Sequence, residues 1–495
     1  MFKKIAALIA AAVLVVSGAG CAAAAKAPTT LSGYYTQDLT LTNCGGGFKC
    51  AKVYAPINWS KPAAGSITLS VTYKPVAGSS KFLFVNPGGP GASGVDFVKE
   101  NLNSIGTAKL RAAYNIVGFD PRGTKGSAPI KCLSASATDE FLYGDTGYEV
   151  GTTADLAASR AAIAKFVAAC KRNTGPVLGF VDTVSAAKDL ELLRRVFGAP
   201  RLDYLGFSYG TFLGTTYAAL FPKLVGRFVL DGAIDPTTTD EQQSLNQLRG
   251  FDLALKAYMA DCIANSSDCP FSGSVANGLN RVKSFFASLE REPLRTDDGR
   301  KLTVAAGSTG MYLTLYSNDY WPYLTQAFNE AFDSQDGTTL MRLADFYYSR
   351  NQDGTYASNE LEANIGINCM DKRSNASDAA RLAQNRKVVA ASPTLGKYWQ
   401  NGSLLCAKWP FPIAKRPASY SASGAPTIMV IGTTGDPATP YQESVSLAHK
   451  ILKKGFLVTF VGEGHTAYGR SNSCVANAVD SFLVSGKLPA TEPRC

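Results

Sequence analysis

The chain has 495 residues, of which 46% are hydrophobic and 18% are charged. This composition excludes a disordered or fibrous protein and supplies enough apolar side chains for one large core or two. The net charge of +10 is small for this length, and no basic run is longer than a pair, so the sequence gives no support for nucleic-acid binding. No apolar run reaches the ~18 to 20 residues that a membrane span requires.

The N-terminus has the features of an export signal. Lys3 and Lys4 precede twelve apolar residues at positions 5–16, and a segment of small residues ends at Cys21. A charged start, a short apolar stretch and small residues in that order predict a signal peptide over residues 1–21. Residues 18–21 also resemble a bacterial lipobox, except that Gly18 stands where Leu is preferred. Lipid attachment at Cys21 and plain cleavage within residues 22–25 are the two alternatives.

The cysteine count fits an oxidising compartment. Ten of the eleven cysteines are left once Cys21 is set aside, and an even number suits five disulfides. Proximity in sequence predicts the pairs Cys44–Cys50, Cys262–Cys269 and Cys474–Cys495, and leaves open the pairing of Cys132, Cys170, Cys369 and Cys406. The chain has no Cys-x-x-Cys motif and only two histidines, so no zinc site is predicted. We expect a secreted or cell-surface protein without cofactors, in contact with the membrane only through a lipid on Cys21.

Short apolar runs that end in Gly/Pro-rich loops predict the strands of a buried parallel sheet. They lie at residues 81–85, 115–119, 202–205, 228–230, 427–431 and 456–461. Residues 67–73 alternate apolar and polar side chains, which predicts a half-exposed antiparallel strand before them. Helical patterns occur at residues 153–170, 183–197, 211–221 and 444–453. This order predicts an α/β core made of residues 35–236 and 401–495.

Residues 237–400 differ from the core segments on either side. Amphipathic helical patterns dominate there, at 241–260, 275–289 and 320–332, and Tyr and Trp are enriched. We expect a mostly helical cap inserted into the α/β core. A separate C-terminal domain is the alternative, but ~95 residues with two core-type strands would form an incomplete sheet.

Residues 206–210 read Gly-Phe-Ser-Tyr-Gly, between a predicted strand and a predicted helix. This is the G-x-S-x-G nucleophile elbow in its expected context. A strand that turns abruptly into a helix strains the serine and projects its hydroxyl, while the glycines allow close backbone approach. The pattern predicts Ser208 as a nucleophile.

A serine hydroxyl needs a base, and a histidine base needs a carboxylate that fixes its tautomer. His465 follows a predicted strand in a loop, whereas His449 lies inside a helical pattern, where a structural or solvated role is expected. Asp436 also follows a predicted strand; its alternative role is a helix N-cap before Pro437. Glu463 is the rival acid, but two residues from His465 it would struggle to reach the ring nitrogen facing away from Ser208. The order Ser, Asp, His is that of α/β-hydrolases.

An acyl-transfer site also needs donors for the developing oxyanion, each worth about 3 to 4 kcal/mol. One predicted donor is the backbone N–H of Tyr209. The other is Gly89, in the loop Asn-Pro-Gly-Gly-Pro-Gly at residues 86–91. A phosphate-binding loop is the rival interpretation, but this segment lacks the Lys-Ser/Thr of a P-loop and the spacing of a dinucleotide fingerprint.

Taken together, these motifs resemble the secreted tripeptidyl aminopeptidases of actinobacteria, which are relatives of proline iminopeptidases within the α/β-hydrolases. The segments that carry the resemblance are 86–94, 118–123, 206–211, 231–236, 367–371 and 436–440. The resemblance implies an α/β-hydrolase fold and exopeptidase chemistry at a free N-terminus, with Ser208, Asp436 and His465 as the triad. Proline iminopeptidases carry His-Gly-Gly-Pro-Gly where this chain has Asn86-Pro87 before the glycines, which favours the tripeptidyl branch.

An aminopeptidase must bind an ammonium group, and a desolvated carboxylate in the cap is its natural partner. Asp371 is the candidate, and an ordinary exposed aspartate is the alternative. Aromatic cap residues are candidates for a substrate pocket, although their helical spacing favours core packing: Tyr312, Tyr316, Tyr320, Trp321 and Tyr323. We therefore expect an exported serine exopeptidase that releases short peptides, tripeptides by the resemblance, from peptides or proteins with a free N-terminus. A secreted carboxylesterase or lipase with the same triad is the alternative.

Overall fold

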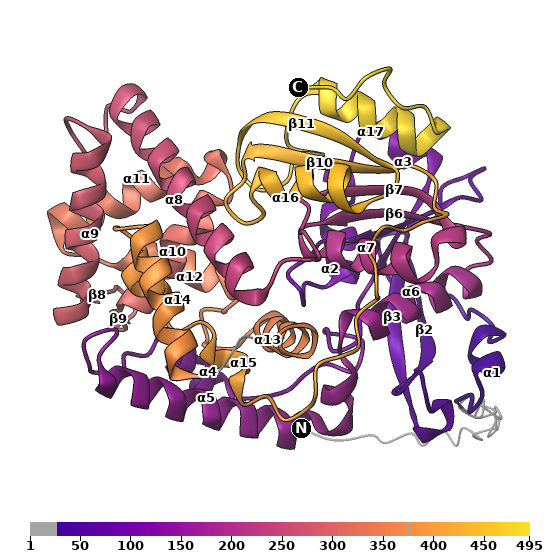
Figure 1. The fold of residues 1–495 in the computed structure, drawn as a ribbon, viewed down its shortest axis with the longest axis horizontal. Coiled ribbons are helices and arrows are strands. Elements are labelled where there is room, and N and C mark those ends of the chain that lie inside the picture. The colour runs from indigo at the N-terminus through magenta and orange to yellow at the C-terminus, as the bar shows by residue number, and fades with distance from the viewer. Residues whose placement is uncertain (1–26, 374–376) are drawn as a thin grey trace, which may run out of the picture.

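A nine-stranded sheet lies at the centre of the computed structural model, which describes residues 27–373 and 377–495 (Figure 1). The predicted signal peptide and Cys21 lie outside these residues. The strand order is β1-β2-β3-β5-β4-β6-β7-β10-β11. Pairing is antiparallel from β1 to β5 and parallel from β5 to β11. The predicted α/β-hydrolase fold with a mostly parallel sheet is confirmed.

The strands lie where the apolar runs predict them, and β2 and the short β1 precede them. Their bounds are β1 Thr42–Asn43, β2 Lys49–Pro56, β3 Ser66–Tyr73, β4 Phe82–Asn86, β5 Asn115–Phe119, β6 Leu202–Phe207, β7 Val225–Asp231, β10 Ile428–Gly435 and β11 Gly455–Glu463.

The expectation that the strand at 67–73 is half-exposed is wrong. On β3, Ser70 is 8% exposed and Thr72 is fully buried. The strand pairs with β2 on one side and β5 on the other. Its polar side chains find partners instead of water, because the Ser70 hydroxyl donates to Gly126 O at 2.8 Å and the Thr72 hydroxyl donates to Lys49 O at 3.1 Å. Burial with internal acceptors explains why an alternating pattern does not mark an exposed face here.

The helices outside the chain between β7 and β10 include the four that the helical patterns predict, at 153–170, 183–197, 211–221 and 444–453. They are α1 Leu31–Tyr35, α2 Gly94–Asn101, α3 Ala108–Ala113, α4 Ala135–Tyr143, α5 Thr153–Thr174, α6 Thr183–Val196, α7 Tyr209–Leu220, α16 Tyr441–Ser446 and α17 Ser473–Ser485. The helix predicted at 444–453 begins earlier, at Tyr441, and ends in a π-helical turn over Leu447–Ile451.

The chain between β7 and β10 forms a mostly helical cap. Its helices are α8 Asp240–Asn265, α9 Val275–Arg291, α10 Val304–Leu315, α11 Trp321–Asn329, α12 Thr338–Tyr347, α13 Glu360–Asp371, α14 Asp378–Ala391 and α15 Leu404–Ala407, with a small hairpin of β8 Leu294–Arg295 and β9 Lys301–Leu302. The helix predicted at 320–332 is shorter, because π-helical residues Glu330–Ser334 follow α11.

Among the described residues, two hydrophobic clusters lie against the sheet and a third holds the cap together. Most cap helices lie to one side of the sheet (Figure 1). Helix α5 runs along the bottom of this view, and α13 lies between the cap helices and the sheet. Leu142 and Tyr143 of α4 belong to the cap core, although α4 precedes the sequence segment predicted as the cap. Ile367 and Cys369 of α13 belong instead to a core of the sheet. Helix α13 therefore connects the cap to the edge of the sheet that carries the site.

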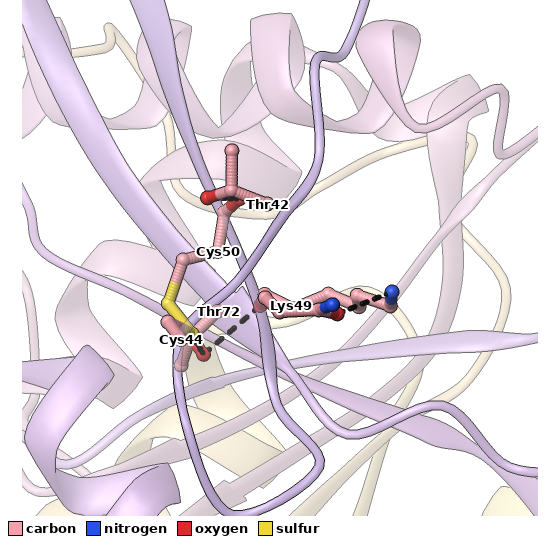
Figure 2. Close-up of a disulfide and its surroundings, with 6 residues drawn as sticks. Thr42, Cys44, Lys49, Cys50 and Thr72 are labelled. Atoms are coloured by element: carbon pink, nitrogen blue, oxygen red, sulfur yellow. Dashed lines mark hydrogen bonds between the residues drawn. A yellow bond between two sulfur atoms is a disulfide. The ribbon is translucent and has the colours of Figure 1, made fainter. Parts of the chain in front are cut away.

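Five disulfides join the cysteines among the described residues. The predicted pairs Cys44–Cys50, Cys262–Cys269 and Cys474–Cys495 are confirmed, and the pairs left open are Cys132–Cys170 and Cys369–Cys406. Figure 2 shows Cys44–Cys50 next to Thr72, whose hydroxyl donates to Lys49 O. Within residues 27–373 and 377–495, no helix is both long and apolar enough to cross a bilayer.

Candidate active site

Ser208 occupies a strained turn between β6 and α7. Its backbone has φ 54° and ψ −124°, a region that L-residues rarely adopt. The flanking glycines are required by close packing: a Cβ on Gly206 would lie 2.5 Å from Gly210 O, and one on Gly210 would lie 2.7 Å from Asn86 O. The Ser208 amide donates to Asp231 O at 2.9 Å. The turn is thus fixed from both sides, at the carboxyl end of the sheet.

His465 and Asp436 lie at the ends of two neighbouring parallel strands, β11 and β10. The His465 Nδ1 atom lies 2.9 Å from each Asp436 carboxylate oxygen. Asp436 Oδ1 also accepts the backbone N–H groups of Ala438 and Thr439, both at 2.9 Å. The N-cap of α16 is Pro440, so Asp436 closes a turn before the helix and does not cap it. Its carboxylate is fully buried and oriented toward the imidazole.

Asp231, at the end of β7, connects the serine turn to the histidine loop. Its carbonyl accepts the Ser208 amide, and its carboxylate accepts the amides of Ala467 at 3.0 Å and Tyr468 at 2.7 Å. A Cβ on the next residue, Gly232, would lie 3.2 Å from His465 Cε1. Burial raises the pKa of the Asp231 carboxyl to about 6, against the lowering effect of its backbone donors. Ser208 and His465 therefore pack against one short segment.

The Gly-rich loop after β4 packs directly on the serine turn. Gly88 and Gly89 have φ of 107° and 102°, and a Cβ on Gly88 would lie 2.7 Å from Phe207 O and 2.9 Å from Ser208 Cβ. The Gly88 amide donates to Asn86 Oδ1 at 3.0 Å, and among the described residues no acceptor is found for the amide of Gly89. Tyr209 is the first residue of α7, where helix amides have no intrahelical acceptor.

A cavity of about 510 Å³ opens beside Ser208, between the sheet and the cap. Gly89 and Tyr209 line it from the core, and the cap contributes polar and aromatic side chains, among them Tyr312, Tyr316, Tyr347, Asn364, Asp371 and Trp399. Of the aromatic candidates, Tyr320 and Tyr323 are exposed, and the Trp321 ring packs against Tyr258 with centroids 6.0 Å apart. Two of the five candidates thus line the cavity.

Asp371 is 5% exposed, so the interpretation as an exposed aspartate is wrong. Its carboxylate accepts from Thr183 twice, from the amide at 2.8 Å and from the hydroxyl at 2.5 Å. The Thr183 hydroxyl also bonds the Tyr209 hydroxyl. Burial, with the charge of Asp182 adding to it, raises the pKa of Asp371 to about 7. This network links α13 to the residue after Ser208, and a role of Asp371 in substrate binding stays a prediction.

Among the described residues, neither rival residue forms a side-chain hydrogen bond with Ser208, Asp436 or His465. The Glu463 Oε2 atom is buried without a hydrogen-bond partner among the described residues, and burial raises the pKa of its carboxyl. His449 lies on the surface in the π-helical turn, with Nε2 2.9 Å from Glu492. That position agrees with the expected structural or solvated role.

Three further residues hold the histidine loop through contacts that sequence reasoning did not predict. The His465 amide donates to Tyr316 O at 2.7 Å, and the two rings lie 5.5 Å apart. Arg470 Nε donates to the carbonyls of His465 at 3.1 Å and Thr466 at 2.9 Å. The Thr439 hydroxyl donates to Asp436 Oδ2 at 3.0 Å and lies 3.3 Å from His465 Nδ1. The position of Thr439, three residues after Asp436, is the sequence signal that could have predicted its contact with the Asp436 carboxylate.

The fold and this arrangement define a serine hydrolase of the α/β-hydrolase class. The family described as TAP-like protein matches residues 392–495. Serine protease Hip1 of Mycobacterium tuberculosis is 32% identical, over 91% of this chain and 88% of its own length. Carboxylesterase B of the same species is 36% identical over 90% and 86%, and tripeptidyl aminopeptidase of Streptomyces lividans is 28% identical over 90% and 83%. This chain belongs to the family of these TAP-like α/β-hydrolases.

Among solved structures, the chain is similar to proline iminopeptidase from Mycobacterium smegmatis. The match has 12% sequence identity and a TM-score of 0.34, and it covers 88% of this chain and 97% of that one.

Proposed function

We propose that this protein is an exported serine exopeptidase that releases short peptides, first of all tripeptides, from free N-termini. The observation that carries the proposal is the cavity between sheet and cap, with the strained Ser208 in its wall and the His465–Asp436 pair beside it. A cap over the serine favours short chain ends over the middle of a folded chain. Relatives named serine protease and tripeptidyl aminopeptidase support peptide substrates.

In the proposed mechanism, His465 Nε2 accepts the proton of the Ser208 hydroxyl while Oγ attacks the scissile carbonyl carbon. The amides of Gly89 and Tyr209 donate to the oxyanion. His465 then gives its proton to the leaving amine, which departs with the C-terminal part of the substrate. Water, deprotonated by His465, attacks the acyl-enzyme carbonyl, the bond to Ser208 Oγ breaks as His465 returns the proton to Oγ, and the N-terminal peptide is released. Asp436 holds the Nδ1 proton and stabilises the imidazolium.

Tripeptide anilides with a free or an N-acetylated terminus test this proposal. We expect kcat/KM to be much higher for the free amine, and we expect Ser208→Ala and His465→Ala to lose turnover and phosphonate labelling of the serine. His449→Ala is the matched control, because it removes the other histidine of the chain from the surface. Full peptidase activity in Ser208→Ala would contradict the mechanism, and equal rates on both anilides would contradict the exopeptidase assignment.

A secreted carboxylesterase is the second candidate, favoured by the 36% identity to carboxylesterase B. It uses the same triad and predicts efficient hydrolysis of p-nitrophenyl acyl esters, with no dependence on an amine. A kcat/KM for such esters that exceeds the value for every free tripeptide anilide would favour it.

The proposed location is outside the cytoplasm, either in the medium or on the cell surface. The disulfides support this location, since such bonds form and persist in oxidising compartments. Lipid attachment at Cys21 is tested by mass spectrometry of the mature N-terminus in the native host. A diacylglycerol on Cys21, absent in Cys21→Ala, would establish the anchor, whereas an N-terminus within residues 22–25 would exclude it.

A further inference from the structure

One basic side chain belongs to the wall of the cavity beside Ser208. Among the described residues that line this cavity, Lys372 is the single lysine or arginine, and Asp240 and Asp371 are the acids. Lys372 is the C-cap residue of α13, and its backbone amide donates to Asn368 O at 2.9 Å. The helix end therefore fixes the backbone of this lysine, and its ammonium group brings a positive charge to the cavity.

The Lys372 ammonium lies near the helix that begins at the nucleophile. Its Nζ atom is 5.8 Å from the centroid of the Phe212 ring, and Phe212 lines the cavity from α7. One helical turn, about 6 Å, separates Phe212 from Ser208. An extended peptide advances about 3.3 Å per residue. A substrate group within two or three residues of the scissile carbonyl is therefore close enough to meet the ammonium.

No carboxylate of the described residues lies within ion-pair distance of this ammonium. Its hydrogen-bond acceptor is the side-chain carbonyl of Gln243, on α8, which also lines the cavity. Two nearby acids have donors of their own: Asp371 accepts twice from Thr183, and Glu443 accepts from a side-chain amide and from a backbone amide. An ammonium group has three N–H donors. Two of those of Lys372 therefore have no acceptor among the described residues.

The surroundings of Lys372 oppose an unpaired positive charge. Burial lowers the pKa of its ammonium, and the charge of Arg416 lowers it further. Arg416 lies over the same Phe212 ring, with Cζ 5.3 Å from the centroid. Three acids at longer range act in the opposite direction: Asp240, Glu443 and Asp371. A partly desolvated cation beside a second cation gains most from an anionic partner in direct contact.

We propose that Lys372 binds a carboxylate of the substrate. This inference deepens the proposed peptidase function and rests on it. A bound carboxylate accepts the N–H groups that Gln243 leaves over and offsets the repulsion from Arg416. The uncharged amide of the same shape gives weaker hydrogen bonds and no ion pair, so it binds less tightly. The carboxylate belongs either to an acidic side chain before the scissile bond or to the C-terminus of a short substrate, and the experiment separates these sources.

The first arm compares wild type with Lys372→Met on alanine tripeptide anilides that carry Glu or Gln at the first, second or third position. We expect wild type to favour Glu over Gln about 10-fold or more at one position, and Lys372→Met to show a ratio of about 1 there. Lys372→Glu is expected to favour lysine over norleucine at the same position. Titration with a serine-directed phosphonate counts correctly folded sites in each variant.

Lys301→Met is the matched control. Lys301 is exposed, lies on β9 of the cap and does not line the cavity, and its substitution removes the same charge. This variant is expected to keep the Glu-to-Gln ratio of wild type. An equal fall of the ratio in both variants would mean that the net charge of the protein attracts acidic substrates, and the assignment to Lys372 would be wrong.

The second arm compares tetra-alanine with its C-terminal amide. A wild-type preference for the acid that Lys372→Met loses would identify the C-terminal carboxylate as the ligand. If Lys372→Met keeps the preferences of wild type, or if wild type distinguishes neither Glu from Gln nor acid from amide, the inference is wrong. Each anilide is also tested N-acetylated: equal rates with and without the acetyl group in wild type contradict the exopeptidase function, while the Glu-to-Gln ratio still tests Lys372.

Discussion

The Asp436 carboxylate is more tightly held than any other group near Ser208. It accepts the amides of Ala438, Thr439 and Thr466 and the Thr439 hydroxyl, in addition to facing His465 Nδ1. Backbone donors fix the position of the acid, so the orientation of the imidazole follows from the path of the chain. The role expected of a carboxylate held in this way is to keep a negative charge in a fixed position. A neutral side chain of the same shape therefore removes only that charge.

Asp436→Asn is therefore expected to lower kcat about 10⁴-fold, because the amide stabilises neither the productive imidazole tautomer nor the imidazolium. Stopped assays on the best peptide anilide, normalised to folded protein, measure the loss. Glu463→Gln is the control: it removes the acid nearest to His465 in sequence, whose Oε2 has no partner among the described residues, and is expected to keep at least half of the activity. Greater loss in Glu463→Gln than in Asp436→Asn would reverse the two assignments.

At the residue scale, sequence reasoning proposed a triad from residue types with reactive side chains. Ser208 and Asp436 each follow a strand within a recognisable motif. His465 also follows a strand and is one of only two histidines in the sequence. Sequence reasoning missed contacts made by backbone atoms, such as Tyr316 O on the His465 amide, because any residue type can supply a carbonyl.

The Gly-rich loop acts as one element whose conformation excludes side chains. Gly88→Ala is expected to lower kcat at least 100-fold, since the new Cβ would lie 2.7 Å from Phe207 O and force the oxyanion donors away from Ser208. Gly78→Ala is the matched control: it also has positive φ, 76°, but no atom lies within 4 Å of the new Cβ. It is expected to lose stability and to keep kcat per folded molecule. Equal kcat in both variants would show that the loop tolerates a side chain.

The disulfide Cys369–Cys406 ties the end of α13 to α15, and Cys406 lines the cavity. Replacing both cysteines by serine is expected to lower the free energy of unfolding by about 4 kcal/mol, from the entropy of the loop it closes, and to raise KM because the cavity wall loosens. Replacing Cys44 and Cys50, which close a much shorter loop (Figure 2) and do not line the cavity, is expected to cost about 2 kcal/mol with KM unchanged. Urea unfolding and peptide kinetics decide between these outcomes, and a raised KM in the second variant alone would refute the argument.

Element types were predictable where one physical signal dominates. Uniformly apolar runs gave the parallel strands, because strands covered on both faces need no alternation. The same signal failed for β3, where alternating Ser70 and Thr72 are buried with internal partners. The helix ends near Ser334 and Ile451 are π-helical, a local geometry that no residue pattern at 320–332 or 444–453 distinguishes from α-helix.

At the scale of the whole molecule, the cap is assembled from two parts of the chain. Leu142 and Tyr143 of α4 enter the cap core together with residues of α8 to α12, more than 90 positions later in the sequence. The amphipathic helical patterns predicted the larger part of the cap, because these helices follow one another in the sequence. The composition of the smaller part does not distinguish it from the rest of the α/β core. Which hydrophobic core a helix joins depends on the side of the sheet on which its connection runs. The site between cap and sheet therefore depends on both parts.

Acids with raised pKa values gather where the sheet faces the cap, so we expect the stability of the protein to depend on pH. Burial raises the pKa of Asp231 to about 6 and of Glu360 and Asp371 to about 7. A carboxyl whose pKa is higher in the folded state than in the unfolded state binds its proton more tightly when folded. Its stabilising contribution is complete below the unfolded value, near 4, and is lost as pH rises through the folded value.

Asp371→Asn is therefore expected to become more stable relative to wild type as pH rises from 5 to 8, by about 3 kcal/mol, because the variant has no carboxyl to ionise. Its carboxamide keeps an acceptor for the Thr183 amide. Urea unfolding of both proteins at pH 5 and pH 8 measures the difference. Asp353→Asn serves as the reference: this exposed carboxyl has its pKa lowered by hydrogen bonds from Thr355, so it stays ionised throughout this range and its effect on stability is expected to be constant. A stability difference between Asp371→Asn and wild type that is constant or shrinks toward pH 8 would mean that Asp371 is already ionised at pH 5, with Thr183 compensating fully for its burial.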